Sequence, residues 1–123
     1  MRVLIGDDSR LIRERIIETL SLFDDIEIVG ETENGSDTLS RLVSLRPDLA
    51  ILDIRMPGKS GLDVIREYRK VSSETKIIVL SNYTNDQYLA RAFEYGADYF
   101  FSKSDDFDKL GSLIGELIRY SKP

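Results

Sequence analysis

The sequence predicts an α/β protein in which five parallel strands form one sheet with helices on both faces. Two observations support this prediction. Five short aliphatic or β-branched runs alternate with five longer amphipathic stretches, and the connections between them are short. Right-handed crossovers from each strand to the next then give a doubly wound sheet. The 123 residues fit one domain, which we expect to span 1–123.

The five strand candidates are brief and largely apolar, as expected for strands that are buried on both faces of a sheet. They are Arg2–Gly6, Ile26–Glu31, Leu49–Leu52, Lys76–Leu80 and Ala97–Phe101. Ligands of such sheets bind beyond the carboxyl ends of the strands. The residues just after each strand are therefore the first place to look for a functional site.

The helix candidates carry apolar residues at helical spacing. They are Ser9–Phe23, Gly35–Leu45, Leu62–Val71, Asn85–Tyr95 and Phe107–Tyr120. Ser9 is a candidate N-cap, Pro47 lies just beyond the second helix, and Gly96 is a candidate C-terminal stop. The expected inward residues are, helix by helix, Ile12, Ile16, Leu20 and Phe23; Leu39, Leu42 and Val43; Leu62, Ile65 and Tyr68; Tyr88, Leu89, Ala92 and Phe93; and Leu110, Leu113, Ile114, Leu117 and Ile118.

The composition excludes several kinds of chemistry. The chain has no cysteine and no histidine, which excludes disulfides, thiolate nucleophiles and imidazole bases. Any metal must therefore be a hard cation held by oxygen. The net charge of −5 argues against nucleic-acid binding by this domain alone. We see no signal-peptide pattern and no membrane span, so we expect a cytoplasmic protein without a membrane partner.

Polar residues follow the strand candidates at one predicted edge of the sheet. Asp7 and Asp8 follow the first strand, Asp53 the third, Ser81 the fourth and Lys103 the fifth. Taken singly, each is more often a helix cap, a turn residue or a solvated surface residue. Their occurrence together at one edge favours a functional site.

Electrostatics constrain what such a cluster can hold. Two carboxylates about 4 Å apart repel by about 4 kcal/mol at an effective dielectric of 20. Three are tolerated only beside cations or with raised pKa values. Lys103 supplies one positive charge, and Mg²⁺, which prefers carboxylate oxygen and water, would supply two more.

Five motifs carry a resemblance to a known family. In chain order they are Asp7-Asp8, Asp53-Ile54-Arg55-Met56-Pro57-Gly58, Leu80-Ser81, Gly96-Ala97-Asp98 and Lys103. Placed at the right strand ends, they resemble the receiver domain of bacterial two-component response regulators over essentially the whole chain. The resemblance implies a flavodoxin-like (βα)₅ fold with strand order 2-1-3-4-5. It also implies a signalling domain rather than an enzyme that acts on a separate small substrate.

The resemblance implies a phosphoacceptor and a metal site. Asp53 would accept a phosphoryl group from a sensor histidine kinase or a histidine phosphotransfer protein. Asp8, Asp53 and the backbone carbonyl of Arg55 would hold Mg²⁺, or Mn²⁺ in its place, and Asp7 would contact the metal mainly through water. The absence of histidine from this chain is compatible with this function, because the phosphorylated histidine belongs to the partner protein.

The remaining motif residues would bind the phosphoryl group and change conformation when it is present. Lys103 would pair with the phosphoryl oxygens, Ser81 would donate a hydrogen bond to one of them, and Asn82 would line the same place. In the family, the residue at Ser81 moves toward the phosphate while the residue at Phe100 turns inward. We expect Phe100 either to act in this switch or to be an ordinary core aromatic. The expected output surface, formed by the fourth helix, fifth strand and fifth helix, includes Tyr88, Arg91, Tyr95, Tyr99 and Phe101 and would contact an effector or a second copy.

Two features depart from the family pattern, at Ser104 and Asn82. Ser104 follows the lysine where many receivers have proline, so the loop there is expected to differ. Asn82 replaces a small residue and should narrow access to the phosphoryl group. Arg55 and Tyr83 are large and would flank the path of the hydrolytic water, so we predict slow autodephosphorylation.

Two other functions are weighed against the switch. A pseudo-receiver would be a constitutive interaction module with a vestigial acidic pocket, which the complete residue set argues against. A Mg²⁺-dependent hydrolase is disfavoured by the short loops and the lack of a lid. The stretches around 26–31 and Gly96-Ala97-Asp98 are similar to receivers that precede helix-turn-helix domains, so any contact with DNA would belong to another domain.

Overall fold

The five predicted strands form a single parallel sheet in the order β2-β1-β3-β4-β5. The computed structural model describes residues 1–121; Lys122 and Pro123, the end of the domain predicted over 1–123, lie outside the described residues. The strands are β1 (Arg2–Gly6), β2 (Glu27–Thr32), β3 (Leu49–Leu52), β4 (Lys76–Ser81) and β5 (Tyr99–Ser102). The predicted doubly wound fold and its strand order are confirmed.

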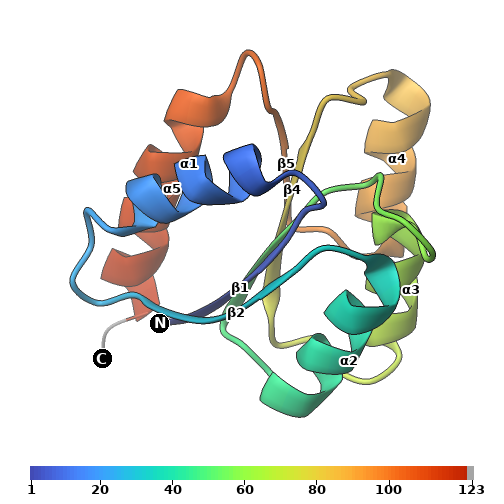
Figure 1. The fold of residues 1–123 in the computed structure, drawn as a ribbon, viewed down its shortest axis with the longest axis horizontal. Coiled ribbons are helices and arrows are strands. Elements are labelled where there is room, and N and C mark those ends of the chain that lie inside the picture. Colours follow the sequence, from blue (N-terminus) through green and yellow to red (C-terminus); the bar gives the residue numbers. More distant parts are fainter. Residues whose placement is uncertain (122–123) are drawn as a thin grey trace.

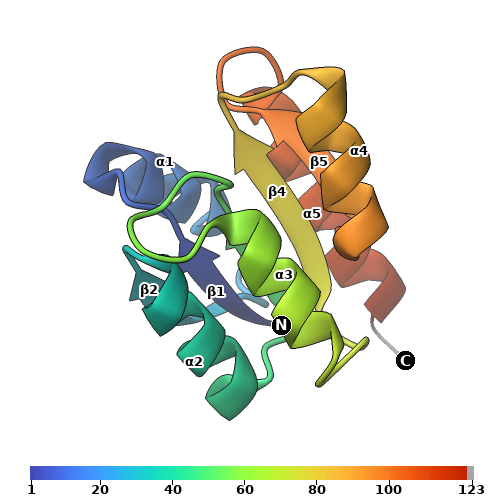
Figure 2. The ribbon, with the colours of Figure 1, turned by 90° about the vertical axis from the view of Figure 1, so that its right-hand side faces the viewer.

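Five helices cover the two faces of this sheet. They are α1 (Arg10–Leu20), α2 (Gly35–Leu45), α3 (Gly61–Arg69), α4 (Asp86–Tyr95) and α5 (Phe107–Ser121). Figure 1 shows α1 and α5 together on one side of the strands and α2, α3 and α4 on the other. Figure 2 looks onto the side covered by α2, α3 and α4. Within residues 1–121, no helix combines the length and the apolar character needed to cross a membrane.

The sheet separates two hydrophobic cores. Successive strand residues point to opposite faces, so Val3 and Ile5 join the core under α1 and α5, while Leu4 joins the core under α2, α3 and α4. β3 is buried throughout, as its continuous apolar run predicts. The central strands are thereby packed on both faces, and this packing sets the positions from which the loops at their carboxyl ends start.

Local signals define most helix ends. The Ser9 hydroxyl accepts a hydrogen bond from the backbone N–H of Ile12 at 3.3 Å, so the predicted N-cap is confirmed. Helix α2 ends at Leu45, and its C-cap residue Arg46 adopts a left-handed φ of 45° just before Pro47. Gly96 ends α4 with a φ of 120°, a conformation that favours glycine.

Three details of the helix predictions are wrong. Helix α1 ends at Leu20, and Phe23 lies beyond it in turns closed by i→i−3 hydrogen bonds, although its ring still packs on the core. Val43 and Phe93, predicted to point inward, are 41% and 47% exposed. Val43 follows the buried Leu42 and Phe93 follows the buried Ala92. One step along a helix rotates the side chain by about 100°, which turns Val43 and Phe93 away from the sheet.

Strand β5 begins two residues later than predicted. The carboxylate of Asp98 accepts the backbone N–H of Ile77 at 2.8 Å and also pairs with Arg69 at 3.1 Å. A side chain thus occupies the ladder position that a strand residue would otherwise fill. Regular pairing therefore starts at Tyr99, which lies opposite Ile78.

Candidate functional site

Three aspartates meet at the carboxyl edge of the sheet. Asp7 and Asp8 follow β1 and Asp53 follows β3, its neighbour in the sheet. The backbone N–H of Asp53 donates to the carbonyl of Gly6 at 2.9 Å, which continues the strand register and sets the two segments side by side. One carboxylate oxygen from each aspartate lies within 4.8 Å of the others. The structure thus brings together the acidic residues that the sequence predicted.

Lys103 bridges two of these carboxylates. Its Nζ atom lies 2.7 Å from Oδ2 of Asp7 and 3.0 Å from Oδ2 of Asp53. The three side chains are between 2% and 7% exposed, whereas Asp8 is exposed to solvent. The backbone N–H of Lys103 donates to the carbonyl of Ser81 at 3.0 Å, so the β4–β5 pairing carries the lysine to the site.

Burial and charge shift the pKa values in this cluster. Burial raises the pKa of Asp53; Lys103 opposes this effect and the neighbouring carboxylate of Asp7 reinforces it. Burial acts to lower the pKa of Lys103, but the contacts with Asp7 and Asp53 outweigh it, so the pKa is raised above its usual value. Lys103 is therefore a permanent cation at neutral pH.

Backbone groups orient the two buried carboxylates. The second oxygen of Asp7 accepts the N–H of Ser9 at 2.8 Å, and the second oxygen of Asp53 accepts the N–H of Ile54 at 2.8 Å. The bond from Ile54 acts against the rise in the pKa of Asp53. Each buried aspartate is thus held at both oxygens, once by a backbone N–H and once by the Lys103 ammonium.

The residue set fits a hard divalent cation. Three carboxylates and one ammonium leave two uncompensated negative charges when all are ionised. Carboxylate oxygens with room for water are the ligands that Mg²⁺ prefers. Asp8 faces solvent, so a cation could arrive there without breaking the buried ion pairs.

Ser81 and Asn82 differ in their surroundings. Ser81 is fully buried at the end of β4, and its hydroxyl oxygen accepts the backbone N–H of Tyr83 at 2.9 Å. The hydroxyl hydrogen remains available to a ligand. Asn82 is exposed at the rim next to Ser81.

Arg55, two residues after Asp53, forms a cluster with the rings of Tyr83 and Tyr88, called here the aromatic cluster. The guanidinium carbon of Arg55 lies 4.6 Å from the centre of the Tyr83 ring, and the rings of Tyr83 and Tyr88 are 5.8 Å apart at 59°. The cluster connects the loop after β3 to the loop before α4 and to α4 itself. A cavity of about 300 Å³ adjoins it between α3 and α4, lined by Ile54, Arg55, Ser60, Leu62, Asp63, Tyr88, Arg91 and Tyr95.

Strand β5 carries aromatic side chains on both faces. Phe100 packs, half-buried, against the core under α2, α3 and α4, whereas Tyr99 and Phe101 pack against the opposite core. Successive side chains of a strand point to opposite faces of the sheet, which accounts for this arrangement. Tyr88 and Tyr95, two other residues of the expected output surface, pack on the same core as Phe100.

The loop after β5 is held by hydrogen bonds. The Ser102 hydroxyl oxygen accepts the N–H groups of Ser104 at 3.3 Å and Asp105 at 3.2 Å, and the Asp106 carboxylate accepts the Ser102 N–H at 3.0 Å. The bond from Ser102, followed by the contact with Lys109, lowers the pKa of Asp106. These hydrogen bonds hold the turn that contains Lys103. They include the N–H of Ser104, the residue at the position where many receivers have proline.

Sequence reasoning missed two residues that shape the site. A Cβ atom on Gly61 would lie 1.9 Å from the carbonyl oxygen of Asp53, so only glycine allows α3 to start against the phosphoacceptor candidate. Arg13 is buried and donates to the Asp7 carbonyl at 2.8 Å. Its position three residues before Ile16 and seven before Leu20 was a signal, since a charge on a buried helical stripe needs partners.

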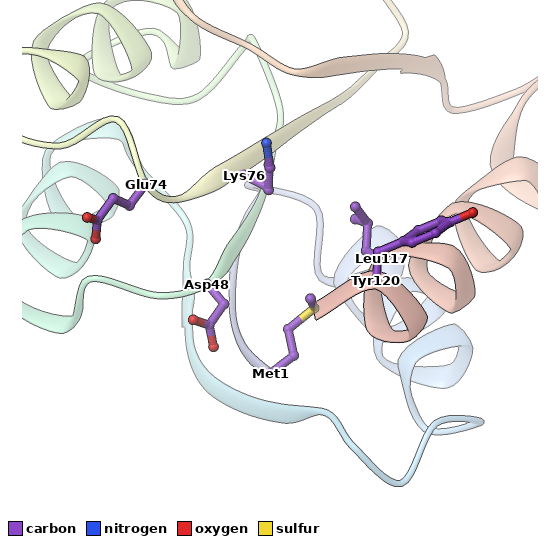
Figure 3. A pocket seen from close by; sticks show the side chains of 6 residues that line it. All are labelled: Met1, Asp48, Glu74, Lys76, Leu117 and Tyr120. Carbon is purple, nitrogen blue, oxygen red and sulfur yellow. The ribbon is translucent and has the colours of Figure 1, made fainter. Parts of the chain in front are cut away.

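A larger cavity, about 460 Å³, lies at the opposite edge of the sheet. It is lined by Met1, Asp48, Glu74, Lys76, Leu117 and Tyr120 (Figure 3). These side chains come from Met1, from α5, from the residues just before β3 and β4, and from the first residue of β4. The carboxylate of Asp48 is engaged by the N–H of Arg2 at 2.7 Å. We place the candidate site at the aspartate cluster, where charge, burial and hydrogen bonding converge.

A doubly wound sheet with three carboxylates and a bridging lysine at its carboxyl edge defines a class of two-component signalling domains. The sequence matches the response regulator receiver domain family over residues 3–114, and the chain belongs to that family. The predicted resemblance and fold are confirmed.

Individual relatives agree with this assignment. The chain is 31% identical over 119 residues to the transcriptional regulatory protein YvfU of Bacillus subtilis, covering 97% of this chain and 60% of that protein. It is 38% identical over 120 residues to a protein-glutamate methylesterase of Carboxydothermus hydrogenoformans, covering 96% and 35%. The chain therefore spans between about a third and three-fifths of these relatives.

Solved structures show the same architecture. The receiver domain of NarL from Mycobacterium tuberculosis has a TM-score of 0.86 at 30% identity, with 96% of this chain and 95% of that chain covered. The response regulator domain of CheB from Thermotoga maritima has a TM-score of 0.85 at 26% identity, with 100% and 98% covered. The chain is thus a receiver domain, the phosphorylation-dependent switch of response regulators, and the pseudo-receiver alternative gains no support over this function.

Proposed function

We propose that Asp53 accepts a phosphoryl group from the phosphohistidine of a sensor kinase or a histidine phosphotransfer protein. The observation that carries this proposal is the contact of Lys103 with both Asp7 and Asp53 in a buried pocket. A structural ion pair alone would not need a third, exposed carboxylate beside it. Asp8, Asp53 and the Arg55 carbonyl would hold Mg²⁺ or Mn²⁺, and Asp7 would act mainly through water.

The transfer needs little from the protein beyond position and charge. A carboxylate oxygen of Asp53 attacks phosphorus, a P–O bond forms, and the electron pair of the broken P–N bond stays on the donor imidazole. Asp53 needs no base, because its ionised form is the nucleophile. Lys103 stabilises charge on the phosphoryl oxygens, and the divalent cation, when bound, neutralises the rest.

Ser81 and Phe100 are the proposed switch residues. The buried Ser81 hydroxyl can donate to a phosphoryl oxygen while it still accepts the Tyr83 N–H. A shift of Ser81 toward the phosphoryl group would move Tyr83 with it and leave space beside Phe100, which is half-buried over the same core as Tyr88. Phe100 lacks a hydroxyl, so its response would depend on packing alone.

The aromatic cluster supports slow loss of the phosphoryl group. Arg55 and Tyr83, which lie two residues beyond Asp53 and Ser81, contact each other, and Asn82 is exposed next to Ser81. Together they would restrict the path of a water molecule that attacks the phosphoaspartate in line. We therefore retain the prediction of slow autodephosphorylation.

The partners follow from the family and from the relatives. YvfU is a transcriptional regulatory protein and the Carboxydothermus relative is a methylesterase, so receivers of this kind serve different effectors. We propose that the surface of α4, β5 and α5 contacts an effector or a second copy, and that this domain itself binds no nucleic acid. Placement in the cytoplasm, with no membrane partner, stays a prediction.

One experiment separates the proposed function from its alternatives. The protein is incubated with phosphoramidate and Mg²⁺, and the intact mass of wild type and Asp53→Asn is measured. A phosphate adduct on wild type alone is the expected result. No adduct on either protein would support the constitutive interaction module. Turnover of the donor without an adduct would support the hydrolase.

A further inference from the structure

A buried arginine lies behind the aspartate cluster. Arg13 belongs to α1 and is 7% exposed. Its Nη1 atom donates to the backbone oxygen of Asp7 at 2.8 Å. Its Nε and Nη2 atoms pair with the carboxylates of Glu31 at 3.2 Å and Glu33 at 3.1 Å. The guanidinium is engaged on three sides, so the side chain is confined to one position.

The contact with the Asp7 carbonyl fixes the peptide group between Asp7 and Asp8, and the preceding peptide group is bound as well. The N–H of Asp7 donates to the carbonyl of Thr32 at 3.0 Å, and the C=O of Asp7 accepts from Arg13. That C=O belongs to the peptide that leads into Asp8, so its orientation sets the direction of the Asp8 backbone. The Asp8 side chain is exposed, and across residues 1–121 no hydrogen bond or ion pair restrains its carboxylate. The backbone is its main restraint.

We propose that Arg13 is a positioning residue for the divalent-cation site. By holding the Asp7–Asp8 peptide, it keeps the Asp8 carboxylate beside those of Asp7 and Asp53. The inference rests on the proposed function, because it needs a cation at these carboxylates. Partners behind metal ligands typically contribute about 10–100-fold to metal affinity.

A purely electrostatic role predicts the opposite result. Replacing Arg13 with a neutral residue removes a positive charge near the site and leaves Glu31 and Glu33 without it. By Coulomb's law alone, a more negative surrounding would strengthen the binding of a divalent cation. Weaker binding of the divalent cation after this replacement therefore indicates that Arg13 positions the site. Stronger binding indicates that Arg13 acts only through its charge.

The test compares Mg²⁺ affinity in three proteins. Wild type, Arg13→Met and Arg10→Met are titrated with MgCl₂ by isothermal calorimetry. Arg10 lies on the same helix and carries the same charge, but it is exposed and pairs only with Glu14 among the described residues. We expect binding about tenfold weaker in Arg13→Met and unchanged in Arg10→Met.

A spectroscopic readout separates positioning from general damage. In Arg13→Met, the amide NMR signal of Ser9 should stay in place, because Asp7 remains anchored by Lys103. The amide signal of Asp8, which belongs to the released peptide, should shift. Shifts spread over both signals and over β1 would indicate structural damage and would count against positioning.

A second variant covers the case in which Arg13→Met does not fold. Arg13→Lys keeps the charge, but a single ammonium cannot contact Asp7, Glu31 and Glu33 together in the geometry of the guanidinium. We expect about threefold weaker Mg²⁺ binding from it. Affinity equal to or above that of wild type in the folded variant would overturn the inference. Failure of wild type itself to bind Mg²⁺ would overturn the proposed metal site as well, so the two failures are distinguishable.

Discussion

The Nζ atom of Lys103 lies 3.0 Å from Oδ2 of Asp53, although the two residues are 50 positions apart in the chain. Their strands are not neighbours, since β4 lies between β3 and β5. The contact therefore forms only when three strands are assembled in register. The ion pair between Lys103 and Asp53 at the site therefore depends on the correct pairing of β3, β4 and β5.

Replacing Lys103 should lower the stability of the folded protein, and added Mg²⁺ should restore part of the lost stability. In Lys103→Met, the buried carboxylates of Asp7 and Asp53 lose their common cation, and breaking a buried pair typically costs about 3–5 kcal/mol. We expect a lower melting temperature in EDTA and partial recovery when Mg²⁺ is added. Thermal unfolding followed by circular dichroism measures both. Lys109→Met, which removes an exposed lysine, is the control; equal losses in the two variants would contradict the prediction.

The raised pKa of Asp53 predicts a pH-dependent stability difference. The folded state holds the Asp53 proton more tightly than the unfolded chain does, so the wild-type carboxyl favours folding less as pH rises from its ordinary value of 3.8 through the raised pKa. In metal-free buffer, Asp53→Asn should therefore gain stability relative to wild type over that interval. Urea unfolding of both proteins across this range measures the gain. A difference that shrinks as pH rises would show that the sign is wrong.

Tyr83 should slow the loss of the phosphoryl group. In Tyr83→Ala, the Arg55 guanidinium loses the Tyr83 ring, and we expect water to gain access to Asp53. We expect phosphate release about tenfold faster, which corresponds to about 1.4 kcal/mol in the barrier. Asn82→Ala should act in the same direction. Phosphate release from the purified phosphoprotein is the measurement, and Tyr120→Ala, at a distant exposed tyrosine, is the control. A lifetime of a few seconds that neither change alters would refute the prediction.

Gly61 should be intolerant of any side chain. The methyl group of Gly61→Ala would meet the Asp53 carbonyl, so the start of α3 must move and Asp53 with it. We expect a loss of at least about 2 kcal/mol in unfolding free energy and weaker phosphoryl acceptance. Gly111→Ala is the matched control, because its methyl group would meet only Thr19 at 3.5 Å and alanine favours helix by about 1 kcal/mol. Equal stability of the two variants would contradict this role of Gly61.

Phe100 should couple the site to the output surface without being needed for phosphoryl acceptance. Phe100→Leu keeps an apolar side chain over the core that includes Tyr88 and Tyr95 but removes the ring. We expect an unchanged phosphate adduct and smaller phosphorylation-dependent shifts of amide NMR signals in α4 and β5. Full-sized shifts in this variant would show that Phe100 is an ordinary core residue.

The strand ends explain why so much of the site could be predicted. Asp7, Asp53 and Lys103 each follow a short apolar run, and parallel strands bring their carboxyl ends to one edge. The types of these residues then limit the chemistry to carboxylate, cation and phosphoryl group. The family motifs added the strand order, which apolar patterns alone do not specify.

Contacts made by loops and helix faces could not be predicted in the same way. The role of Gly61 depends on how closely α3 approaches the Asp53 backbone, which no local pattern encodes. Tyr88 joins Arg55 and Tyr83 only because α4 starts beside the loop after β3. Val43 and Phe93 are apolar, and hydropathy alone does not distinguish the rim of a helical stripe from its centre.

The aromatic side chains on the two faces of the edge strand β5 are linked, because one strand backbone carries them all. Phe100 is partly covered by one helical layer, and Tyr99 and Phe101 are partly covered by the other. A small rotation of the strand about its own axis would bury more of one aromatic face and uncover more of the opposite face. A partner that contacts one face of this strand would thus change the exposure of the aromatic side chains on the other face.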